Sequence, residues 1–291
     1  MPMTAALDTI LQGALLGGLY ALFATGLSLI FGVMRLVNIA HGDLIVLAAY
    51  VALLVVQLTG LGPIASLLLV VPVMFTLGYA LQRGLLNRTL GPDILPPLLV
   101  TFGLSIVIQN GLLQAFSADS RKLQAGAIET ASIALAPDLA VGWFPLLNLA
   151  TAIAVIGALQ LLLYRTRLGR AFRAVSDDPE TAQLYGIDNR HLFALAMALA
   201  LGVVSVAAVF LAVRTNFDPA VGPARLLFAF EAVIIGGLGS LWGTLAGGII
   251  LGIAQSVGAR VDPAWQLLAG HIAFLAVLLL RPRGLFPRAV D

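Results

Sequence analysis

Long apolar runs, separated by short polar stretches, make up most of this chain. A transmembrane helix needs about 20 mostly apolar residues, because the bilayer core contains no water that could bind a non-helical backbone. Seven runs are of about this length, at residues 9–33, 40–58, 62–82, 95–117, 142–164, 190–213 and 264–280. Each of them predicts one membrane-spanning helix. We therefore expect an all-α integral membrane protein, built as a polytopic helical bundle.

An eighth apolar stretch, residues 226–258, does not have the length of a single span. Its roughly 33 residues are too many for one straight crossing and few for two full ones. We expect either two short helices that break around residues 239–243 or a re-entrant hairpin. The chain then makes about eight or nine crossings, in one transmembrane domain that covers residues 1–291.

The arginines indicate which loops face the cytoplasm, because short loops rich in Lys and Arg remain on that side. The densest cluster follows the fifth run, with Arg165, Arg167, Arg170 and Arg173. This cluster places the loop inside, and counting spans backwards from it places the N-terminus outside. If residues 226–258 make an even number of crossings, the C-terminus is cytoplasmic. We expect a multi-pass protein of the inner (plasma) membrane with this orientation.

The composition agrees with a membrane protein and excludes several function classes. Apolar residues make up 60% of the 291 residues and charged residues 10%, with a mean hydropathy of +1.02. A net charge of +2 provides no basic face for nucleic acid, and without cysteine there are no disulfides or thiolate metal sites. The single lysine, Lys122, does not follow a glycine-rich loop, so no ATP-binding loop is present. We expect no cofactor and no catalysis; transport driven by ATP would use a separate ATPase.

Glycines inside the apolar runs repeat at intervals of four residues. Small residues one helical turn apart allow helix backbones to approach closely in lipid. This spacing predicts tight helix packing at three pairs, Gly13 and Gly17, Gly243 and Gly247, and Gly248 and Gly252.

A short helix is predicted in the polar segment that follows the fifth run. Asp178 can cap its N-terminus, Pro179 suits the first helical position, and Glu180 complements the positive end of the helix dipole. Gly186 suits the left-handed residue just beyond the C-terminus. The segment at about 165–190 therefore contains a helix of about two turns.

So short a helix is not stable alone in water, and it must pack on its own bundle or on a partner. Its mixed surface, with Ala182, Leu184 and Tyr185 among acidic residues, suits docking into a groove of a soluble partner. The alternative is a capped loop helix that lies on the membrane surface.

Ionisable residues inside the apolar runs are candidates for a solute path, because a charge in hydrocarbon is costly and is usually kept for a pathway or a partner. Glu231 and His271 are two such residues; a structural pairing of Glu231 with an arginine or a helix end, and a packing role for His271, are the alternatives. Gln109 and Asn110 in the fourth run are expected to bridge helices.

The stretch "RLVNIAHGDLI", residues 35–45, places Asn38, His41 and Asp43 between the first two runs. If the second helix begins at the membrane interface, Asn38 caps it and the other two side chains anchor the turn. If it begins inside the bilayer, His41 and Asp43 face the passage near its inner gate. We expect the helix to begin at the interface.

Four stretches resemble the permease subunits of branched-chain amino acid ABC transporters, and most closely the shorter of the two paired paralogues. They are "GLYALFATGLSLIFGVMRLVNIAHGDLIVLAAY" near the N-terminus, "AVSDDPETAQLYGID", "AVIIGGLGSLWGTLAGG" and "RPRGLF" near the C-terminus. The resemblance covers nearly the whole chain in order and implies the permease fold of ABC importers.

The resemblance also implies partners. They are a second permease subunit, usually forming a heterodimer, two cytoplasmic ATPase subunits and an extracytoplasmic binding protein that delivers leucine, isoleucine, valine or a related solute. The residues implied to couple to the ATPase are Arg173, Asp178, Pro179, Glu180, Ala182, Leu184, Tyr185 and Gly186.

The residues fit two other function classes less well. A stand-alone secondary transporter should have paired discontinuous helices around an ion site, yet only residues 226–258 look discontinuous. An intramembrane enzyme would need a nucleophile and base or a metal set. His41 and Asp43 are two residues apart, a spacing that does not put them on one helix face. The permease subunit is therefore the favoured interpretation.

Overall fold

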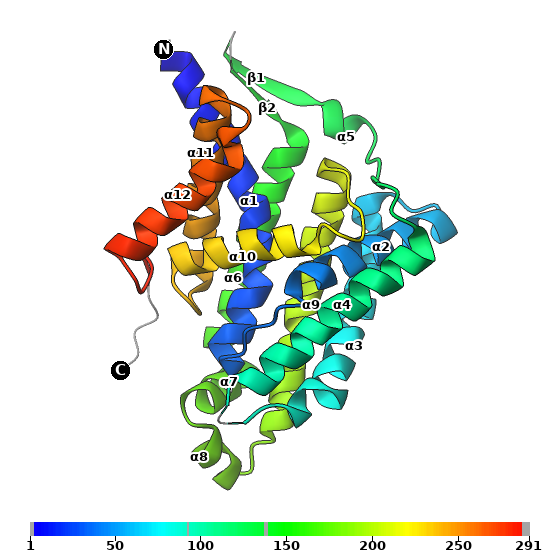
Figure 1. Cartoon of the computed structure of the whole chain (residues 1–291), viewed down its shortest axis with the longest axis vertical. Coiled ribbons are helices and arrows are strands. Elements are labelled where there is room, and N and C mark those ends of the chain that lie inside the picture. Colours follow the sequence, from blue (N-terminus) through cyan, green and yellow to red (C-terminus); the bar gives the residue numbers. More distant parts are fainter. Residues whose placement is uncertain (1–2, 92, 137–138, 287–291) are drawn as a thin grey trace.

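The computed structural model describes residues 3–91, 93–136 and 139–286, which fold into a helical bundle (Figure 1). All seven predicted spans are helices with ends close to those expected, except that the first begins several residues earlier. They are α1 (Met3–Met34), α2 (His41–Thr59), α3 (Pro63–Gly84), α4 (Leu95–Phe116), α6 (Trp143–Arg165), α9 (Asn189–Arg214) and α12 (Trp265–Leu280). Six of these, with α11 (Leu241–Val261), are long and apolar enough to cross a membrane; α12 is apolar but shorter.

The stretch 226–258 is divided between two helices. α10 (Gly222–Gly236) ends in a turn at residues 237–240, and α11 follows directly. The break thus lies a little before the predicted position. The 15 residues of α10 span about 22 Å, less than the thickness of a bilayer core. In Figure 1, α10 lies across the bundle, roughly transverse to α1.

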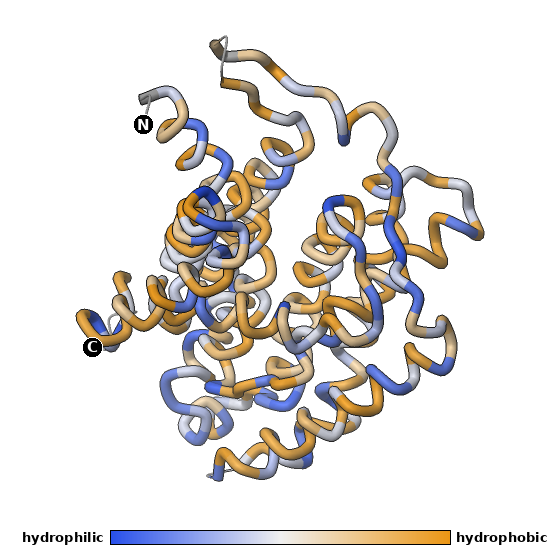
Figure 2. The backbone as a smooth tube through the Cα atoms, turned by 45° about the horizontal axis from the view of Figure 1, so that its top comes forward, coloured by the Kyte–Doolittle hydropathy of each residue, from blue (hydrophilic) through white to orange (hydrophobic). Residues whose placement is uncertain are grey.

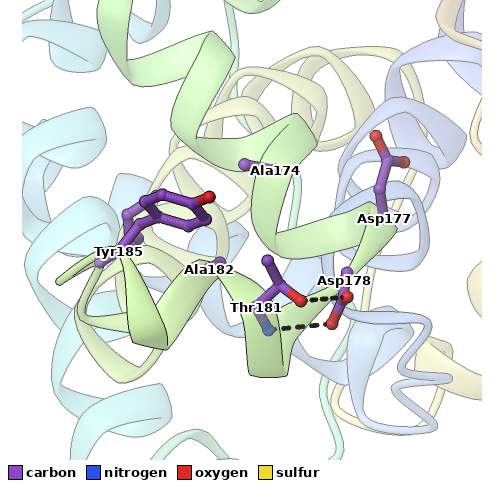
Figure 3. Close-up of a pocket in the computed structure, with 7 residues that line it drawn as sticks. Ala174, Asp177, Asp178, Thr181, Ala182 and Tyr185 are labelled. Carbon is purple, nitrogen blue, oxygen red and sulfur yellow. Dashed lines mark hydrogen bonds between the residues drawn. The ribbon is translucent and has the colours of Figure 1, made fainter.

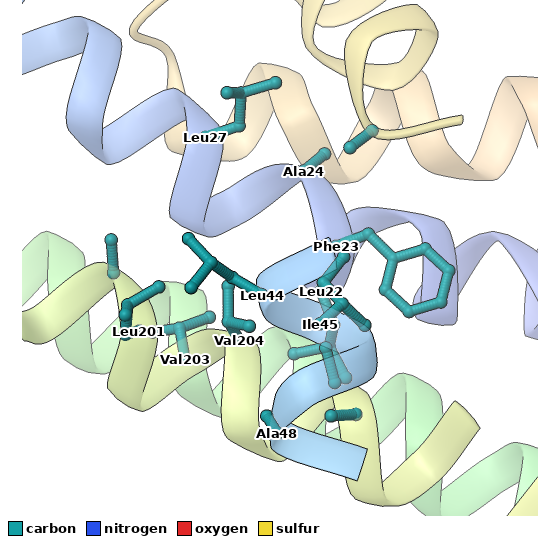
Figure 4. Close-up of a cluster of buried hydrophobic side chains, with 14 of the residues drawn as sticks. Leu22, Phe23, Ala24, Leu27, Leu44, Ile45, Ala48, Leu201, Val203 and Val204 are labelled. Carbon is teal, nitrogen blue, oxygen red and sulfur yellow. The ribbon is translucent and has the colours of Figure 1, made fainter. Parts of the chain in front are cut away.

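Two helices form the interior of the bundle. In α1 and α9, 83% and 89% of the most apolar segment is buried, compared with 17–22% in α3, α4 and α6. Leu22 and Phe23 of α1, Leu44 of α2 and Val204 of α9 pack together in the core (Figure 4). Many apolar side chains of the outer helices are exposed, and Figure 2 shows that hydrophobic residues predominate along these helices. Lipid or another membrane subunit is needed to cover them.

Glycines bring α11 into backbone contact with two neighbours, as their spacing predicted. Towards α1, a Cβ atom added to Gly248 would lie 2.6 Å from the carbonyl oxygen of Gly17. Gly13 and Gly252 approach each other in the same way, so the two helices run antiparallel. On the side of α10, a Cβ atom on Gly247 would overlap the carbonyl oxygen of Ala232. Side chains at these positions would separate the helices.

The polar connections gather at two ends of the bundle. The N-terminal part of α1 lies at the same end as a hairpin of β1 (Ser132–Ala136) and β2 (Leu139–Gly142) (Figure 1). This hairpin and α5 (Ala127–Thr130) are additions to the expected all-α fold. α7 (Arg167–Asp177) and α8 (Pro179–Leu184) lie at the opposite end. The short helix η1 (Leu86–Arg88) follows α3.

The C-terminal residues 281–286 fold back onto the end of α10. The N–H of Leu285 donates to the carbonyl oxygen of Ile235, and that of Phe286 donates to Gly236, both at 2.9 Å. Gly284, at φ 79°, lies against Gly237 too closely for any side chain. The "RPRGLF" segment thus binds the last carbonyl groups of α10, which have no partner inside their own helix.

Candidate functional site

The short helix α8 begins and ends as its sequence predicted. The Asp178 carboxylate accepts hydrogen bonds from the backbone N–H of Glu180 at 3.1 Å and of Thr181 at 3.0 Å, and from the Thr181 hydroxyl at 2.5 Å (Figure 3). Pro179 is the first helical residue, and Gly186 adopts the left-handed conformation at φ 80°. Beyond Leu184 the chain turns back towards α9.

The charge of Asp178 stabilises this cap. The hydroxyl and the backbone N–H of Thr181, together with the N–H of Glu180, hold the pKa of Asp178 below its ordinary value. At the start of α9, the N–H of His191 and the nearby Arg83 guanidinium lower the pKa of Asp188 in the same way. Both carboxylates are therefore ionised at neutral pH.

A second helix, α7, precedes α8 and was not predicted. The Thr166 side chain caps it by accepting the N–H of Gly169 at 3.0 Å. Gly169, Phe172 and Val175 are buried, three residues apart on one face. The arginines of this segment indicated a loop on the cytoplasmic side, and the apolar spacing between them is the signal that identifies the helix.

Arg173, one of the coupling candidates, faces the bundle. Its guanidinium donates to the carbonyl oxygen of Leu163 near the end of α6 and lies 5.2 Å from the centre of the Tyr164 ring. Cations bind favourably at the carbonyl end of a helix and over aromatic rings. Arg173 thereby holds α7 against the end of α6.

The outer surface of α8 is apolar and unusually exposed. Leu184 is 87% exposed and Tyr185 84% exposed, whereas Ala182 faces inward and is buried. Beside them lies a shallow groove of about 370 Å³, shown in Figure 3. It is lined by Ala174, Asp177, Asp178, Thr181, Ala182, Tyr185 and Ile187. Two large exposed side chains beside a groove, outside the spanning helices, are typical of a protein-binding surface.

Hydrogen bonds connect this surface to the two interior helices. The Ser176 hydroxyl of α7 donates to the carbonyl oxygen of Gly32 in α1 at 2.7 Å. The Asn189 amide, at the start of α9, donates to the carbonyl oxygen of Pro179 at 2.7 Å. α7 and α8 are therefore each bonded to one of the two interior helices.

The stretch 35–45 packs into the interior of the bundle. His41 and Asp43 are buried, and the His41 Nε2 atom is 2.8 Å from the carbonyl oxygen of Phe23. Phe23 precedes the end of α1 by eleven residues, about 16 Å along the helix. α2 therefore begins inside the bundle; that it begins at the membrane interface stays a prediction. The N-cap residue is Ala40; Asn38 instead accepts the Ala40 N–H in the preceding turn.

Asp43 connects three helices at this depth. Its carboxylate accepts a hydrogen bond from the Gln109 amide of α4 at 2.9 Å and lies against Gly222, the first residue of α10. Gln109 bridges helices as predicted. Asn110 does not, because its amide donates to Ile106 of its own helix. His41 and Asp43 have different partners and do not form a pair.

A second polar group joins α1, α10, α11 and α12. Glu231, buried in α10, contacts the Nδ1 atom of His271 in α12. The Tyr20 hydroxyl of α1 donates to the Gln255 side chain of α11 at 2.5 Å. Tyr20 also packs against Phe228 of α10, with ring centres 5.1 Å apart. Glu231 thus pairs with a histidine, and not with an arginine or a helix end. The sequence did not single out Tyr20 and Gln255 as functional, because single polar residues are common in apolar runs.

The path candidates of the sequence therefore form two groups. Asn38, His41 and Asp43 lie where α2 and α10 begin, and Glu231 and His271 lie further along α10. Nine residues separate Gly222 from Glu231, about 13 Å along the helix. α10 connects the two groups.

Comparison with known proteins identifies the family. The model of the family described as "Branched-chain amino acid transport system / permease component" matches residues 9–279. The chain belongs to this family. It is 29% identical to the high-affinity branched-chain amino acid transport system permease protein BraD of Pseudomonas aeruginosa, over 97% of this chain and 96% of BraD.

Two paralogues from Escherichia coli place the chain within the family. It is 28% identical to LivH over 97% of this chain and 96% of LivH. With LivM it shares 25% identity over 92% of this chain but 68% of LivM. Both are high-affinity branched-chain amino acid transport system permease proteins. The chain has the length of the shorter paralogue, as its sequence indicated.

Proposed function

We propose that this chain is the transmembrane permease subunit of an ATP-driven importer for branched-chain or related amino acids. The family match over residues 9–279 carries this proposal. The fold supports it, because a bundle with two buried interior helices presents an exposed, capped helix at one end. The chain moves the solute and leaves ATP hydrolysis to separate subunits.

α8 is the surface that meets the ATPase. Leu184 and Tyr185 enter a groove of that partner. The cap at Asp178 keeps α8 helical while the bound ATPase exerts force on it. When the ATPase moves, α7 and α8 displace α1 and α9 through Ser176 and Asn189. The interior of the bundle then opens to one side of the membrane.

The assembly contains three kinds of subunit contact. Two ATPase subunits bind α8 and its equivalent, and a second permease subunit covers part of the apolar outer helices. That a longer paralogue exists among the relatives supports a heterodimer. A solute-binding protein docks at the end that holds the N-terminus and the β1–β2 hairpin. This end is extracytoplasmic, and the C-terminus is cytoplasmic.

The solute passes along α10. The group at Asn38, His41 and Asp43 forms one end of this path, and the group at Glu231 and His271 lies further along it. α10 is too short to cross the bilayer and lies transverse to α1. Its movement therefore changes the shape of the passage while the membrane-spanning helices stay in place.

Copurification and uptake test the function together. We expect an affinity-tagged chain, expressed with its neighbouring transport genes, to bring down two ATPases and a second permease. The assembly in lipid vesicles, with the binding protein outside, should take up labelled leucine, isoleucine or valine only with ATP inside. Uptake by the chain alone, driven by an ion gradient, would contradict the proposal and indicate a secondary transporter.

A further inference from the structure

One face of α6 is apolar, exposed and bounded by an aromatic residue at each end. The opposite face, with Asn148, Ala152 and Ile156, is buried in the bundle. Trp143 and Tyr164 are exposed at the two ends of α6, about 32 Å apart along the helix, which is close to the thickness of a bilayer core. Tryptophan and tyrosine favour the two interfaces of a bilayer. Between them lies the α6 stripe, which consists of Leu146, Ala150, Ile153, Ala154, Ala158 and Leu161.

A row of arginines begins where the α6 stripe ends. Arg165 is the last residue of α6, and a single residue separates it from α7. On α7, Arg167, Arg170 and Arg173 follow one another at intervals of three residues and so lie along one side of the helix. The Arg173 guanidinium lies 5.2 Å from the centre of the Tyr164 ring. This contact places the arginine side of α7 beside the aromatic end of the stripe.

Three of these arginines face away from the bundle. Arg165, Arg167 and Arg170 are exposed, and in the described part of the chain none of them forms an ion pair. Residues 139–176 contain no aspartate or glutamate, and Asp177 lies about 10 Å beyond Arg170 along α7. The first turn of α7 adds the positive end of a helix dipole. This corner therefore carries an excess of positive charge at the end of a membrane-spanning surface.

An anionic phospholipid matches both parts of this surface. Guanidinium groups bind phosphate through parallel hydrogen bonds, and basic clusters next to a spanning helix attract anionic headgroups. The acyl chains of the same molecule match the apolar α6 stripe. A soluble anion would contact the arginines alone. A soluble protein partner would also leave the stripe uncovered, because the stripe lies within the membrane.

We propose that an anionic phospholipid binds at this corner, with its phosphate held by Arg165, Arg167 and Arg170 and its acyl chains along the α6 stripe. The lipid is a structural ligand and is not transported, so the inference does not depend on the proposed function. A phosphate bound here fixes the level of α7 at the membrane surface, next to α8.

Native mass spectrometry in detergent tests the class of ligand. Phosphatidylglycerol and phosphatidylcholine with the same acyl chains are added in turn to the purified chain and to its assembly, so that only the headgroup differs. We expect both samples to bind phosphatidylglycerol at least tenfold more tightly. Glycerol 3-phosphate, which has the phosphate without acyl chains, should not displace it at equal concentration.

Three results of this titration would overturn the proposal. Equal affinity for the two lipids would exclude recognition of the charge, and displacement by glycerol 3-phosphate would identify a site for a soluble anion. Binding by the chain alone, with none by the assembly, would show that another subunit occupies the corner.

Variants then assign the binding to this corner. An arginine near an anionic headgroup strengthens binding about fivefold, so Arg165→Gln/Arg167→Gln/Arg170→Gln should weaken phosphatidylglycerol binding about a hundredfold. Arg165→Lys/Arg167→Lys/Arg170→Lys keeps the charge and should stay within about fivefold of wild type. Wild-type affinity in the glutamine variant would exclude the site.

The matched control removes three exposed arginines near the ends of other helices, in Arg88→Gln/Arg190→Gln/Arg260→Gln. This variant loses the same net charge and should bind phosphatidylglycerol as the wild type does. An equal loss of affinity in the two glutamine variants would show that the total charge attracts the lipid, and the corner would have no special role.

A photoreactive lipid locates the acyl chains in the wild-type protein. Phosphatidylglycerol with a diazirine in one acyl chain is cross-linked to the assembly, and the labelled peptides are identified by mass spectrometry. Residues 146–161 of α6 should carry at least threefold more label than α3 or α12, which also expose apolar side chains. Even labelling of the three helices would overturn the site. This measurement needs no substitution, so it decides the proposal where a variant does not fold.

Discussion

The carboxylate of Asp43 lies directly against the backbone of Gly222, so α2 and α10 begin at the same point of the bundle. The contact is mutual, because Gly42 is pressed against the carbonyl oxygen of Gly222. Two helix N-termini thus meet a buried carboxylate, which complements their positive ends. This junction fixes where the transverse helix α10 enters the interior.

Gly222→Ala should disrupt this junction. The added methyl group would overlap the Asp43 carboxylate, and overpacking of a tight core costs typically about 1–3 kcal/mol. We expect a lower midpoint of thermal unfolding in detergent and a loss of most solute uptake. Gly111→Ala in α4 is the matched control, since its new methyl group would meet nothing within 4 Å. Equal stability of the two variants would show that the contact is not tight.

Gly248→Ala should separate α11 from α1. A Cβ atom there would come within 2.6 Å of the Gly17 carbonyl oxygen, and neither backbone can move without displacing its helix. We expect destabilisation of about 1–3 kcal/mol, measured by thermal unfolding of the purified chain. Gly157→Ala, on the open face of α6, should be neutral or slightly stabilising. A wild-type unfolding midpoint for Gly248→Ala would refute the packing argument.

Gly186→Val should uncouple ATP hydrolysis from transport. The residue adopts φ 80°, a conformation that costs a β-branched side chain about 1–3 kcal/mol. We expect normal membrane insertion and ATP hydrolysis by the assembly, with uptake reduced at least tenfold. Gly186→Asn, which tolerates the left-handed conformation, should restore most uptake. Normal coupled transport by Gly186→Val would exclude a role for this turn in coupling.

Acid should loosen α8 before it affects the spanning helices. The pKa of Asp178 is lower in the folded chain than its ordinary value of 3.8, because Thr181 and backbone N–H groups bind the carboxylate. The cap is therefore fully effective at neutral pH, and its contribution is lost as pH falls through this lowered pKa. Hydrogen–deuterium exchange should show faster amide exchange in residues 179–186 below about pH 4, corrected for intrinsic rates. In Asp178→Asn, amide exchange in residues 179–186 should show no such acceleration as the pH falls.

The orientation is tested with reporters. A reporter fused after residue 290 should be active in the cytoplasm, and one inserted in the loop 118–141 should be active on the opposite side. The arginine-rich segment 165–173 and the position of the β1–β2 hairpin at the other end of the bundle support this result. Activity of both reporters on the same side would refute the topology.

The spanning helices and the α8 cap were predictable because each depends on local chemistry. Apolar length alone gave the seven helices, and Asp178, Pro179 and Gly186 sit at positions whose backbone conformations those residues favour. α7 was missed because its arginines fit a loop equally well. The hairpin in the loop 118–141 was missed because its nine strand residues form too short an apolar pattern.

Depth was the property that hydropathy did not provide. The residues between α1 and α2 return into the bundle, so His41 contacts Phe23 well before the end of α1. A count of apolar residues contains no information about such a return.

The C-terminal segment has a consequence for how the protein is made. Leu285 and Phe286 bind the last carbonyl groups of α10, which the ribosome synthesises about fifty residues earlier. Membrane insertion proceeds as the chain emerges, yet the end of α10 stays without these hydrogen bonds until residues 285 and 286 have been made. The last carbonyl groups of the transverse helix therefore obtain their partners only after α11 and α12 have followed it.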